Sequence, residues 1–216
     1  MEIPIVEIFE SIQGEGKNQG ILSIFLRLPF CNLRCSFCDS KYTYENPKFE
    51  WKNVKEIFEI IKKTNIPNIV ITGGEPLLWQ KNLLPLVKSI KKFIEIETNG
   101  TIIPLKEFDK YIDQYNVSPK LSNSGEKKEK RLNFKVLKWF AKNKKSYFKY
   151  VIDKEIDIKE VIEEVKKLKI DNRRVYLMPC AKTKKELEEK SKIVIKLCKK
   201  YNFNYSDRLH IRLGLP

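Results

Sequence analysis

The stretch Cys31-Asn32-Leu33-Arg34-Cys35-Ser36-Phe37-Cys38 places three cysteines in one short segment, with the spacing C-x3-C-x2-C. Three thiolates from one loop can bind three irons of a cubane [4Fe-4S] cluster and leave the fourth iron without a protein ligand. An iron of this kind can bind a small molecule and pass an electron to it. The apolar run directly before the cysteines, residues 21–28, predicts a buried strand that ends at this loop.

Two other uses of the cysteines compete with the cluster. A structural zinc site would need Cys180 or Cys198 as a fourth ligand, but Cys180 closes a predicted strand and Cys198 lies on the apolar face of a predicted helix, as expected for core packing. Disulfides are disfavoured because the chain has five cysteines, an odd number, and three of them are too close together to pair. The spacing therefore favours an iron-sulfur cluster.

Apolar runs alternate with amphipathic helical patterns along the chain, which is typical of β/α units around a mostly parallel sheet. The predicted strands cover residues 21–28, 68–72, 93–97, 111–117, 147–152, 174–178 and 209–213. The predicted helices cover residues 54–63, 82–92, 134–142, 156–168 and 184–201, and a polar loop covers 122–130. This count is too small for a closed eight-fold barrel. We predict one α/β domain over residues 1–216, an incomplete β/α barrel of about six mostly parallel strands.

Polar or glycine-rich loops follow several of these strands. Besides the cysteine loop they are Gly73-Gly74-Glu75-Pro76, Thr98-Asn99-Gly100 and Ser118-Pro119-Lys120. Each one alone is an ordinary turn. Because the carboxyl ends of parallel strands share one rim, and ligands bind at that rim in α/β folds, the four loops together predict one binding site.

Composition limits the chemistry and the partners. The chain of 216 residues has one histidine, His210, so a zinc hydrolase with two histidine ligands is excluded. Its formal net charge of +15 comes from lysines that are mixed with glutamates in nearly every helical segment. This pattern indicates a solvated, ion-paired surface rather than a face that binds nucleic acid directly. An acidic N-terminal segment and the lack of a long apolar stretch predict a cytoplasmic protein without a membrane partner.

The cysteine spacing, the aromatic Phe37 before the last cysteine and the Gly73-Gly74-Glu75 turn together resemble the radical S-adenosylmethionine superfamily. The resemblance implies a [4Fe-4S] cluster on Cys31, Cys35 and Cys38, with S-adenosylmethionine bound at the free iron and cleaved to a 5′-deoxyadenosyl radical. It also implies a set of cofactor-binding residues, namely Phe37, Cys38, Asp39, Gly73, Gly74, Glu75, Thr98, Asn99, Ser118, Pro119 and Lys120.

Other segments resemble one family within it, the 7-carboxy-7-deazaguanine synthases. They are Phe9-Glu10-Ser11-Ile12-Gln13-Gly14-Glu15-Gly16, Arg27, Cys38-Asp39-Ser40, residues 117–121 and the end Gly214-Leu215-Pro216. This resemblance implies ring contraction of 6-carboxy-5,6,7,8-tetrahydropterin to 7-carboxy-7-deazaguanine with loss of ammonia, for the queuosine or archaeosine bases of tRNA. It implies no dedicated catalytic acid or base, a Mg²⁺ ion at Ser40, a homodimer, and a reductant protein such as flavodoxin or ferredoxin.

The expected substrate-binding residues are Ile12, Gln13, Gly14, Glu15, Arg27, Thr72 and Pro216. Glycines around Gln13 and Glu15 predict an exposed loop whose side chains read the edge of the pterin ring, while Arg27 would bind the carboxylate as a bidentate fork. The N-terminal loop and the C-terminal tail would thus complete the active site. Ser40 keeps the hydroxyl oxygen of a metal-binding threonine but lacks the methyl group that fixes its rotamer.

Two alternatives remain at this point. A glycyl-radical-enzyme activase would use the same cluster and the same Gly73-Gly74-Glu75 turn, but it gives no reason for the segment Ser11 to Gly16. A zinc-stabilised basic protein that binds nucleic acid would need clustered basic and aromatic residues on one face, and the sequence shows dispersed mixtures of lysine and glutamate instead.

Overall fold

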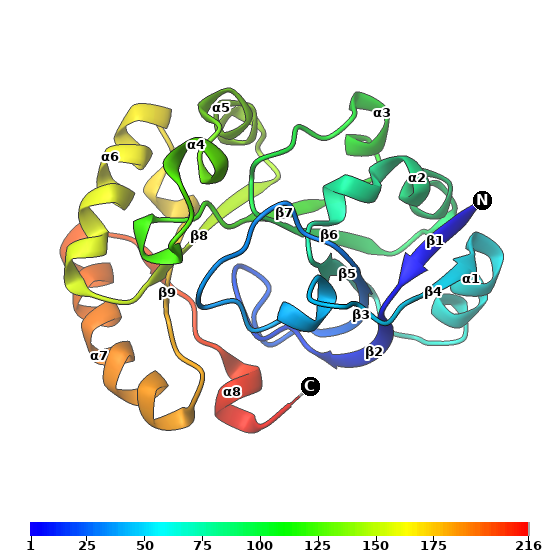
Figure 1. Ribbon diagram of the computed structural model, residues 1–216, viewed down its shortest axis with the longest axis horizontal. Coiled ribbons are helices and arrows are strands. Elements are labelled where there is room, and N and C mark those ends of the chain that lie inside the picture. The colour runs from blue at the N-terminus through cyan, green and yellow to red at the C-terminus, as the bar shows by residue number, and fades with distance from the viewer. Residues whose placement is uncertain (216) are drawn as a thin grey trace.

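The computed structural model describes residues 1–215, and Pro216 lies outside the described residues. An eight-stranded sheet curves through the centre of the molecule (Figure 1). Its strands, from one edge to the other, are β10 (Asn204–Tyr205), β9 (Val175–Pro179), β8 (Ser146–Ile152), β7 (Gln114–Val117), β6 (Phe93–Thr98), β5 (Asn68–Gly73), β3 (Leu22–Leu28) and β2 (Glu7–Ile12). Every neighbouring pair is parallel except β2 with β3. The run from β3 to β9 is the predicted incomplete β/α barrel.

Helices cover the outer face of this sheet, apart from the short C-terminal helix α8 (Leu209–Leu213), which lies at the open end of the barrel (Figure 1). The other helices are α1 (Val54–Lys62), α2 (Gln80–Ser89), α3 (Lys106–Asp109), α4 (Lys128–Arg131), α5 (Phe134–Lys142), α6 (Ile158–Leu168) and α7 (Lys184–Tyr201). Helix α7 has the predicted bounds because Thr183 and Glu186 form a capping box at its start and Asn202 takes the left-handed conformation at its end. The core lies between helices and sheet, where Ile71, Leu83 and Phe140 are fully buried.

Several parts of the chain differ from the prediction, and among them the short strand β10 and helix α3 were not predicted. Residues 209–213 form helix α8 rather than a strand, since the backbone N–H of Leu209 donates to Gly14 O and turns the chain away from the sheet. The polar segment 122–130 contains the 3-10 turn Ser122–Ser124 and helix α4. At the N-terminus, β2 and a small antiparallel sheet of β1 (Glu2–Ile5) and β4 (Glu50–Asn53) were not predicted.

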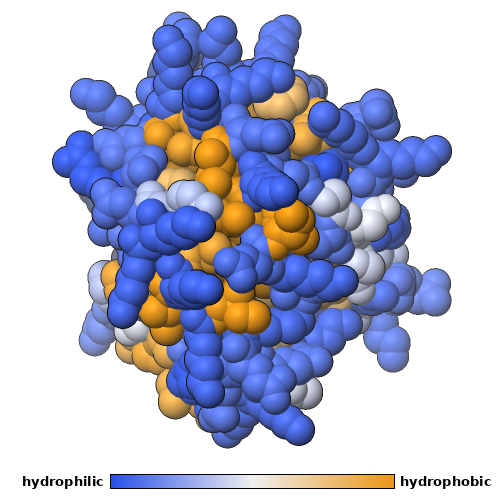
Figure 2. Space-filling model, turned by 90° about the vertical axis from the view of Figure 1, so that its left-hand side faces the viewer, coloured by the Kyte–Doolittle hydropathy of each residue, from blue (hydrophilic) through white to orange (hydrophobic). Residues whose placement is uncertain are grey.

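Apolar side chains gather over the outer face of α6 and α7, framed by hydrophilic ones (Figure 2). Ile156 and Ile195 are among the exposed apolar residues there, and Ile162 and Phe203 line a shallow groove. Among the helices described over residues 1–215, none is both long and apolar enough to cross a membrane.

Candidate active site

Two connected cavities open at the carboxyl ends of the strands. The first, here called the cluster cavity, is lined by the three cysteines of the C-x3-C-x2-C segment and by residues from the ends of β5 to β9. The second, here called the Arg27 cavity, lies between β2, β3 and α8. Both are lined by Glu15, Asp39, Ser40, Thr72 and Glu97, so the two cavities share a wall.

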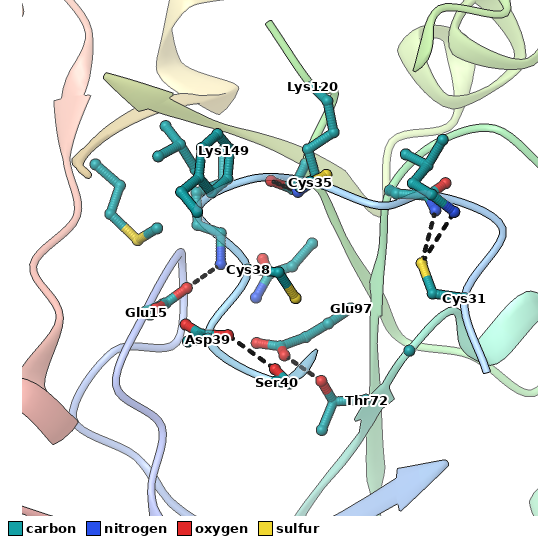
Figure 3. A pocket seen from close by; sticks show the side chains of 18 of the residues that line it. Glu15, Cys31, Cys35, Cys38, Asp39, Ser40, Thr72, Glu97, Lys120 and Lys149 are labelled. Atoms are coloured by element: carbon teal, nitrogen blue, oxygen red, sulfur yellow. Dashed lines mark hydrogen bonds and ion pairs between the residues drawn. The ribbon is translucent and has the colours of Figure 1, made fainter. Parts of the chain in front are cut away.

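The cysteine loop is held in place by backbone contacts from distant segments. The N–H of Ser36 donates to Ser124 O at 2.9 Å, and the N–H of Arg34 donates to the Glu126 carboxylate, so the segment after β7 supports the loop. Two N–H groups point at the sulfur of Cys31, from the backbone of Leu33 at 3.4 Å and from the side chain of Asn99 at 3.8 Å (Figure 3). Donors of this kind stabilise a thiolate that binds metal.

The spacing of the thiols fits a cubane better than zinc. Within residues 1–215, the one group of three or more His, Cys, Asp or Glu side chains whose ligand atoms all lie within 4.8 Å of one another is Glu15, Asp39 and His210. At least two of the three loop sulfurs are therefore more than 4.8 Å apart, farther than the roughly 3.8 Å between thiolates in a tetrahedral zinc site. In a cubane each thiolate binds a different iron, so a wider spread is expected.

The two remaining cysteines, Cys180 and Cys198, lie outside the cysteine loop. Cys198 is buried in the core on α7, as predicted, and its Sγ donates to Asn204 O. Cys180 ends the β9 segment and lines the far side of the cluster cavity. Burial raises the pKa of the Cys35 thiol to about 11, although Lys120 partly offsets this effect. The residues present fit a [4Fe-4S] cluster whose positive charge would favour the thiolates.

The Gly73-Gly74-Glu75 turn begins at the end of β5 and packs against the start of the cysteine loop. A Cβ at Gly74 would overlap the carbonyl oxygen of Phe30, the residue before Cys31, and Gly73 has a φ of +126°. Glycines are required here because two backbone segments pack closely against each other. The backbone N–H of Glu75 donates to Phe30 O at 2.8 Å, which fixes the start of the cysteine loop.

Glu75 itself lies beneath the cluster cavity rather than in its wall. Its carboxylate is fully buried and accepts hydrogen bonds from Leu77 N, Thr98 Oγ1 and Asn99 N. Burial raises the pKa of this carboxyl above its usual range, and the three donors partly offset the effect. The predicted turn Thr98-Asn99 is thereby tied to the predicted Gly73-Gly74-Glu75 turn.

The other predicted cofactor residues gather around the cluster cavity. Lys120 Nζ donates to Ser118 Oγ at 2.9 Å, and both residues line the cavity. Pro119 is buried and lines neither cavity. The predicted residues in the wall of the cluster cavity are Phe37, Cys38, Asp39, Ser40, Thr72, Gly73, Gly74, Thr98, Asn99, Ser118 and Lys120.

Arg27 lies in the Arg27 cavity, and its side chain is only 17% exposed. Its Nε donates to Glu7 at 2.6 Å, and the guanidinium lies between the rings of Phe9 and Tyr42, 5.3 and 5.9 Å from their centroids. The anion that pairs with this arginine is thus Glu7, whose side chain is 40% exposed. Its two Nη groups remain available to a carboxylate, as the bidentate prediction requires. Thr72, on the next strand, donates to Glu97 at 2.6 Å.

The loop around Gln13 is not exposed, and this prediction was wrong. Gln13 is 2% exposed, and its amide donates to Glu95 at 2.8 Å and to Glu97 at 3.2 Å. Gly16 needs its positive φ, and its N–H donates to Ser206 Oγ at 2.8 Å. The loop folds inward because polar partners on β6 and in the C-terminal segment satisfy its backbone and side chains. Ile12 and Gly14 line the Arg27 cavity beside Gln13.

Glu15 lies in a buried ion-pair network at the shared wall (Figure 3). Its carboxylate contacts Lys149 Nζ and accepts Arg208 Nε at 2.9 Å. Burial alone would raise the pKa of Glu15, but the charges of Lys149 and Arg208 outweigh it and hold that pKa well below its usual range. Arg208 also pairs with Asp39, whose side chain is 52% exposed. Partial desolvation would raise the pKa of Asp39, but the charge of Arg208 outweighs this effect and lowers that pKa.

Beside this ion-pair network, the oxygen atoms of Ser40 and Asp39 fit a magnesium ion. Ser40 Oγ donates to Asp39 Oδ1 at 2.8 Å, while Arg208 occupies Oδ2 of the same carboxylate. Hydroxyl and carboxylate oxygens suit Mg²⁺, which also keeps several waters. The nearby triad of Glu15, Asp39 and His210 is less suitable as a whole, because the Glu15 carboxylate is already neutralised by two cations.

Several residues of the site were missed in the sequence. Lys149 interrupts the apolar strand β8 as Arg27 interrupts β3. A charged residue inside an apolar strand is therefore the signal that could have identified Lys149. Glu95 alternates with Ile94 and Ile96 on β6, which places it on the face of Glu97. Arg208 and the cavity residues at the end of β9 carry no such signal. Those residues are Met178, Cys180, Ala181 and Lys182.

Comparison with known proteins identifies the family of the chain. The model of the Radical SAM superfamily matches residues 26–189. The chain is 35% identical to a 7-carboxy-7-deazaguanine synthase of Pyrobaculum aerophilum, over 97% of this chain and 93% of the relative. It is 36% identical to the enzyme of the same name from Hyperthermus butylicus, over 98% of this chain and 93% of the relative. A crystal structure of QueE from Escherichia coli matches with a TM-score of 0.75 and 25% identity, over 96% of this chain and 94% of that one.

Proposed function

The chain belongs to the radical SAM superfamily and, within it, to the 7-carboxy-7-deazaguanine synthases, and from this premise we propose how its own residues carry out the reaction. The enzyme converts 6-carboxy-5,6,7,8-tetrahydropterin to 7-carboxy-7-deazaguanine by ring contraction with loss of ammonia. The observation that supports this assignment most directly is the shared wall, because it lets two ligands lie side by side, one at the cysteines and one at Arg27.

When bound, a [4Fe-4S] cluster and S-adenosylmethionine supply a 5′-deoxyadenosyl radical that removes a hydrogen atom from C6 of the substrate. Cys31, Cys35 and Cys38 hold the cluster in this proposal. The remaining predicted residues of the cluster cavity hold S-adenosylmethionine, with Lys120 and Ser118 as polar contacts. Glu75 does not contact S-adenosylmethionine in this proposal. Its buried carboxylate instead holds Thr98 and Asn99 in place by accepting their hydrogen bonds.

The Arg27 cavity takes the pterin in this proposal. The free Nη groups of Arg27 bind the substrate carboxylate, with the guanidinium held between Phe9 and Tyr42. Thr72 and Glu97 offer a hydroxyl and a carboxylate to the ring edge. Gln13 supports Glu97 from behind, so we assign its side chain to support and its neighbours Ile12 and Gly14 to the wall.

No side chain needs to act as a dedicated acid or base. The buried carboxylates nearest the Arg27 cavity already accept hydrogen bonds, and the carboxylate of Glu15 is paired with two cations. These groups bind and orient the substrate and exclude water from the shared wall. The proposed contact of the Pro216 carboxylate with the substrate lies outside the described residues.

A magnesium ion would be held by the hydroxyl of Ser40 and by Oδ1 of Asp39, the oxygen that does not pair with Arg208, and it would stabilise the negative charge of the substrate carboxylate. The same proposal includes a cytoplasmic homodimer that receives electrons from a flavodoxin or ferredoxin and does not bind nucleic acid directly. The product feeds the synthesis of queuosine or archaeosine in tRNA.

Similarity to deazaguanine synthases over nearly the whole chain argues against the two alternative functions, the glycyl-radical-enzyme activase and the zinc-stabilised nucleic-acid-binding protein.

One experiment tests this function. The protein is reconstituted anaerobically with iron and sulfide and incubated with S-adenosylmethionine, a reductant, Mg²⁺ and 6-carboxytetrahydropterin. We expect a brown protein that forms 7-carboxy-7-deazaguanine, identified by its mass. Cleavage of S-adenosylmethionine without this product would leave the superfamily standing and refute the substrate.

A further inference from the structure

One arginine near the C-terminus joins three segments that are far apart in the sequence. The Arg208 side chain is 6% exposed, and its guanidinium uses all three nitrogens. Nε donates to Glu15 Oε1 at 2.9 Å, Nη1 donates to the carbonyl oxygen of Ala181, and Nη2 donates to Asp39 Oδ2. The backbone N–H of Arg208 donates to Asp207 at 2.9 Å, which fixes the start of its own segment.

The two carboxylates that Arg208 holds belong to different parts of the site. Asp39 directly follows Cys38 in the cluster loop, defined here as residues 29–40. Glu15 belongs to the substrate loop, defined here as residues 13–21, which joins β2 to β3. Lys149 pairs with Glu15 alone, and His210 lies 3.9 Å from Glu15 and within 4.8 Å of Asp39. Among residues 1–215, Arg208 is the cation that forms ion pairs with both carboxylates.

The chemistry of the guanidinium suits this role. Glu15 and Asp39 carry like charges, and both line the wall that the two cavities share, Glu15 with 14% and Asp39 with 52% of its side chain exposed. A planar arginine with donors in a fixed fork can hold two carboxylates at a set distance and angle, whereas a lysine ammonium is a flexible point charge. A shift of Glu15 would therefore be passed through Arg208 to Asp39, which lies between Cys38 and Ser40 in the sequence.

We propose that Arg208 is a positioning residue that couples the substrate loop to the cluster loop, so that radical formation at the cluster stays matched to a correctly seated substrate. This inference rests on the proposed function, because it assigns the two loops to substrate and cluster. Arg208 touches no reacting atom in this role. It acts through Glu15 on one side and through Asp39 on the other.

The test compares Arg208→Gln and Arg208→Lys with Arg174→Gln. Arg174 is a suitable control because its guanidinium also has three acceptors, here the backbone carbonyls of Ala141, Asn143 and Ser146, at the opposite end of the strands. Each protein is reconstituted, and its iron content, its deazaguanine product and its released 5′-deoxyadenosine are measured. A displacement of about 1 Å in a reacting geometry costs about a hundredfold in rate.

We expect Arg208→Gln to retain its iron, to lose about a hundredfold in product formation, and to release at least about ten times more 5′-deoxyadenosine per product than the wild type. Arg208→Lys should recover part of the coupling, and Arg174→Gln should keep the wild-type ratio. If product and 5′-deoxyadenosine fall together in Arg208→Gln, with an unchanged ratio, the coupling role is refuted. Equal ratios in Arg208→Gln and Arg174→Gln would refute it too.

A second measurement needs no bound cofactor. In the apoprotein, hydrogen exchange of the backbone amides in residues 13–21 and 36–40 should rise together in Arg208→Gln and stay at the wild-type rate in Arg174→Gln. A rise in one loop alone would refute the coupling. Failure of the proposed function is seen separately, because then the wild type itself forms no deazaguanine while the exchange pattern still reports on Arg208.

Discussion

The side-chain amide of Gln13 donates to the carboxylate of Glu95 at 2.8 Å, and both residues are buried. Asn18 and Asn116 donate to the same carboxylate. This cluster ties the substrate loop to the middle of β6, two residues before Glu97, which lines both cavities. A buried carboxylate that has only neutral donors around it holds its proton more tightly than one in water.

The first prediction concerns the dependence of stability on pH. Burial, and after it the charge of Glu97, raise the pKa of Glu95 from 4.5 to about 8. Between these values the folded protein keeps a proton that the unfolded chain has released, so its stability falls as the pH rises, by up to about 1.4 kcal/mol for each pH unit. Glu95→Gln has no such proton and should gain stability relative to the wild type across this window.

Urea unfolding near the two ends of that pH window checks this prediction. Glu163→Gln, on the exposed side of α6, serves as the control and should follow the wild-type dependence. If the curves of wild type and Glu95→Gln stay parallel from acid to alkaline pH, Glu95 does not hold a proton in the folded state.

A second prediction separates the cluster cysteines from a core cysteine. Cys35 and Cys198 are both 7% exposed and both free, but only Cys35 lies in the C-x3-C-x2-C loop. After reconstitution, Cys35→Ala should lose the brown chromophore and all product formation, because three thiolates are required to hold three irons. Cys198→Ala should keep its iron and lose about 1 to 3 kcal/mol of stability through the small cavity it leaves. Equal loss of iron in both variants would contradict the assignment of the ligands.

The third prediction tests why Gly74 is a glycine. A Cβ at this position would overlap the carbonyl of Phe30, so Gly74→Ala must move the backbone that leads into Cys31. We expect poor cluster assembly, measured as iron per protein, together with a fall in stability. The control is Gly214→Asn: Gly214 has a φ of +70° and no atom within 4 Å of an added Cβ, and asparagine tolerates this conformation. Normal iron content in Gly74→Ala would show that the close approach is not required.

The sequence was most informative where the pattern was local. Strand β5 is a buried apolar run between a helix and a glycine turn, and periodicity is sufficient to identify it. By contrast, Leu209, Ile211 and Leu213 alternate as in a strand, yet they form α8, because the hydrogen bond from Leu209 to Gly14 is a tertiary contact. Strand β2 contains Glu7 and Glu10 and lies at the sheet edge, where polar residues are tolerated and the apolar signal is weak.

The residues of the site could also be predicted only where the sequence pattern is local. The cysteine loop and the strand-end turns were identified because spacing and fold place them at one rim. The inward fold of the loop around Gln13 depends on partners about 80 residues away, at Glu95 and Glu97. Arg208 was missed for the same reason, since each of its three partners lies at least 27 residues from it.

The fourth prediction concerns magnesium. Ser40 presents its hydroxyl beside Asp39, but it lacks the methyl group that restricts the rotamer of a threonine. Ser40→Thr should therefore lower the Mg²⁺ concentration for half-maximal activity, while Ser40→Ala should raise it. A titration of product formation with Mg²⁺ measures both, with iron content as the control. If all three proteins respond alike, the hydroxyl of Ser40 does not contact the ion.

The last prediction concerns Arg27. Its guanidinium is held by Glu7 through Nε and by the rings of Phe9 and Tyr42, which leaves the two Nη groups for a carboxylate. Arg27→Lys keeps the charge but loses the fork, and charge-assisted hydrogen bonds contribute about 1.5 to 3 kcal/mol each. We expect the KM for the carboxypterin to rise by about ten- to a hundredfold, with unchanged iron content. Arg173→Lys, which alters an exposed ion pair with Asp171, is the matched control. A pterin without its carboxylate should bind wild type and Arg27→Lys equally well; a difference between them would mean that Arg27 contacts the ring rather than the carboxylate.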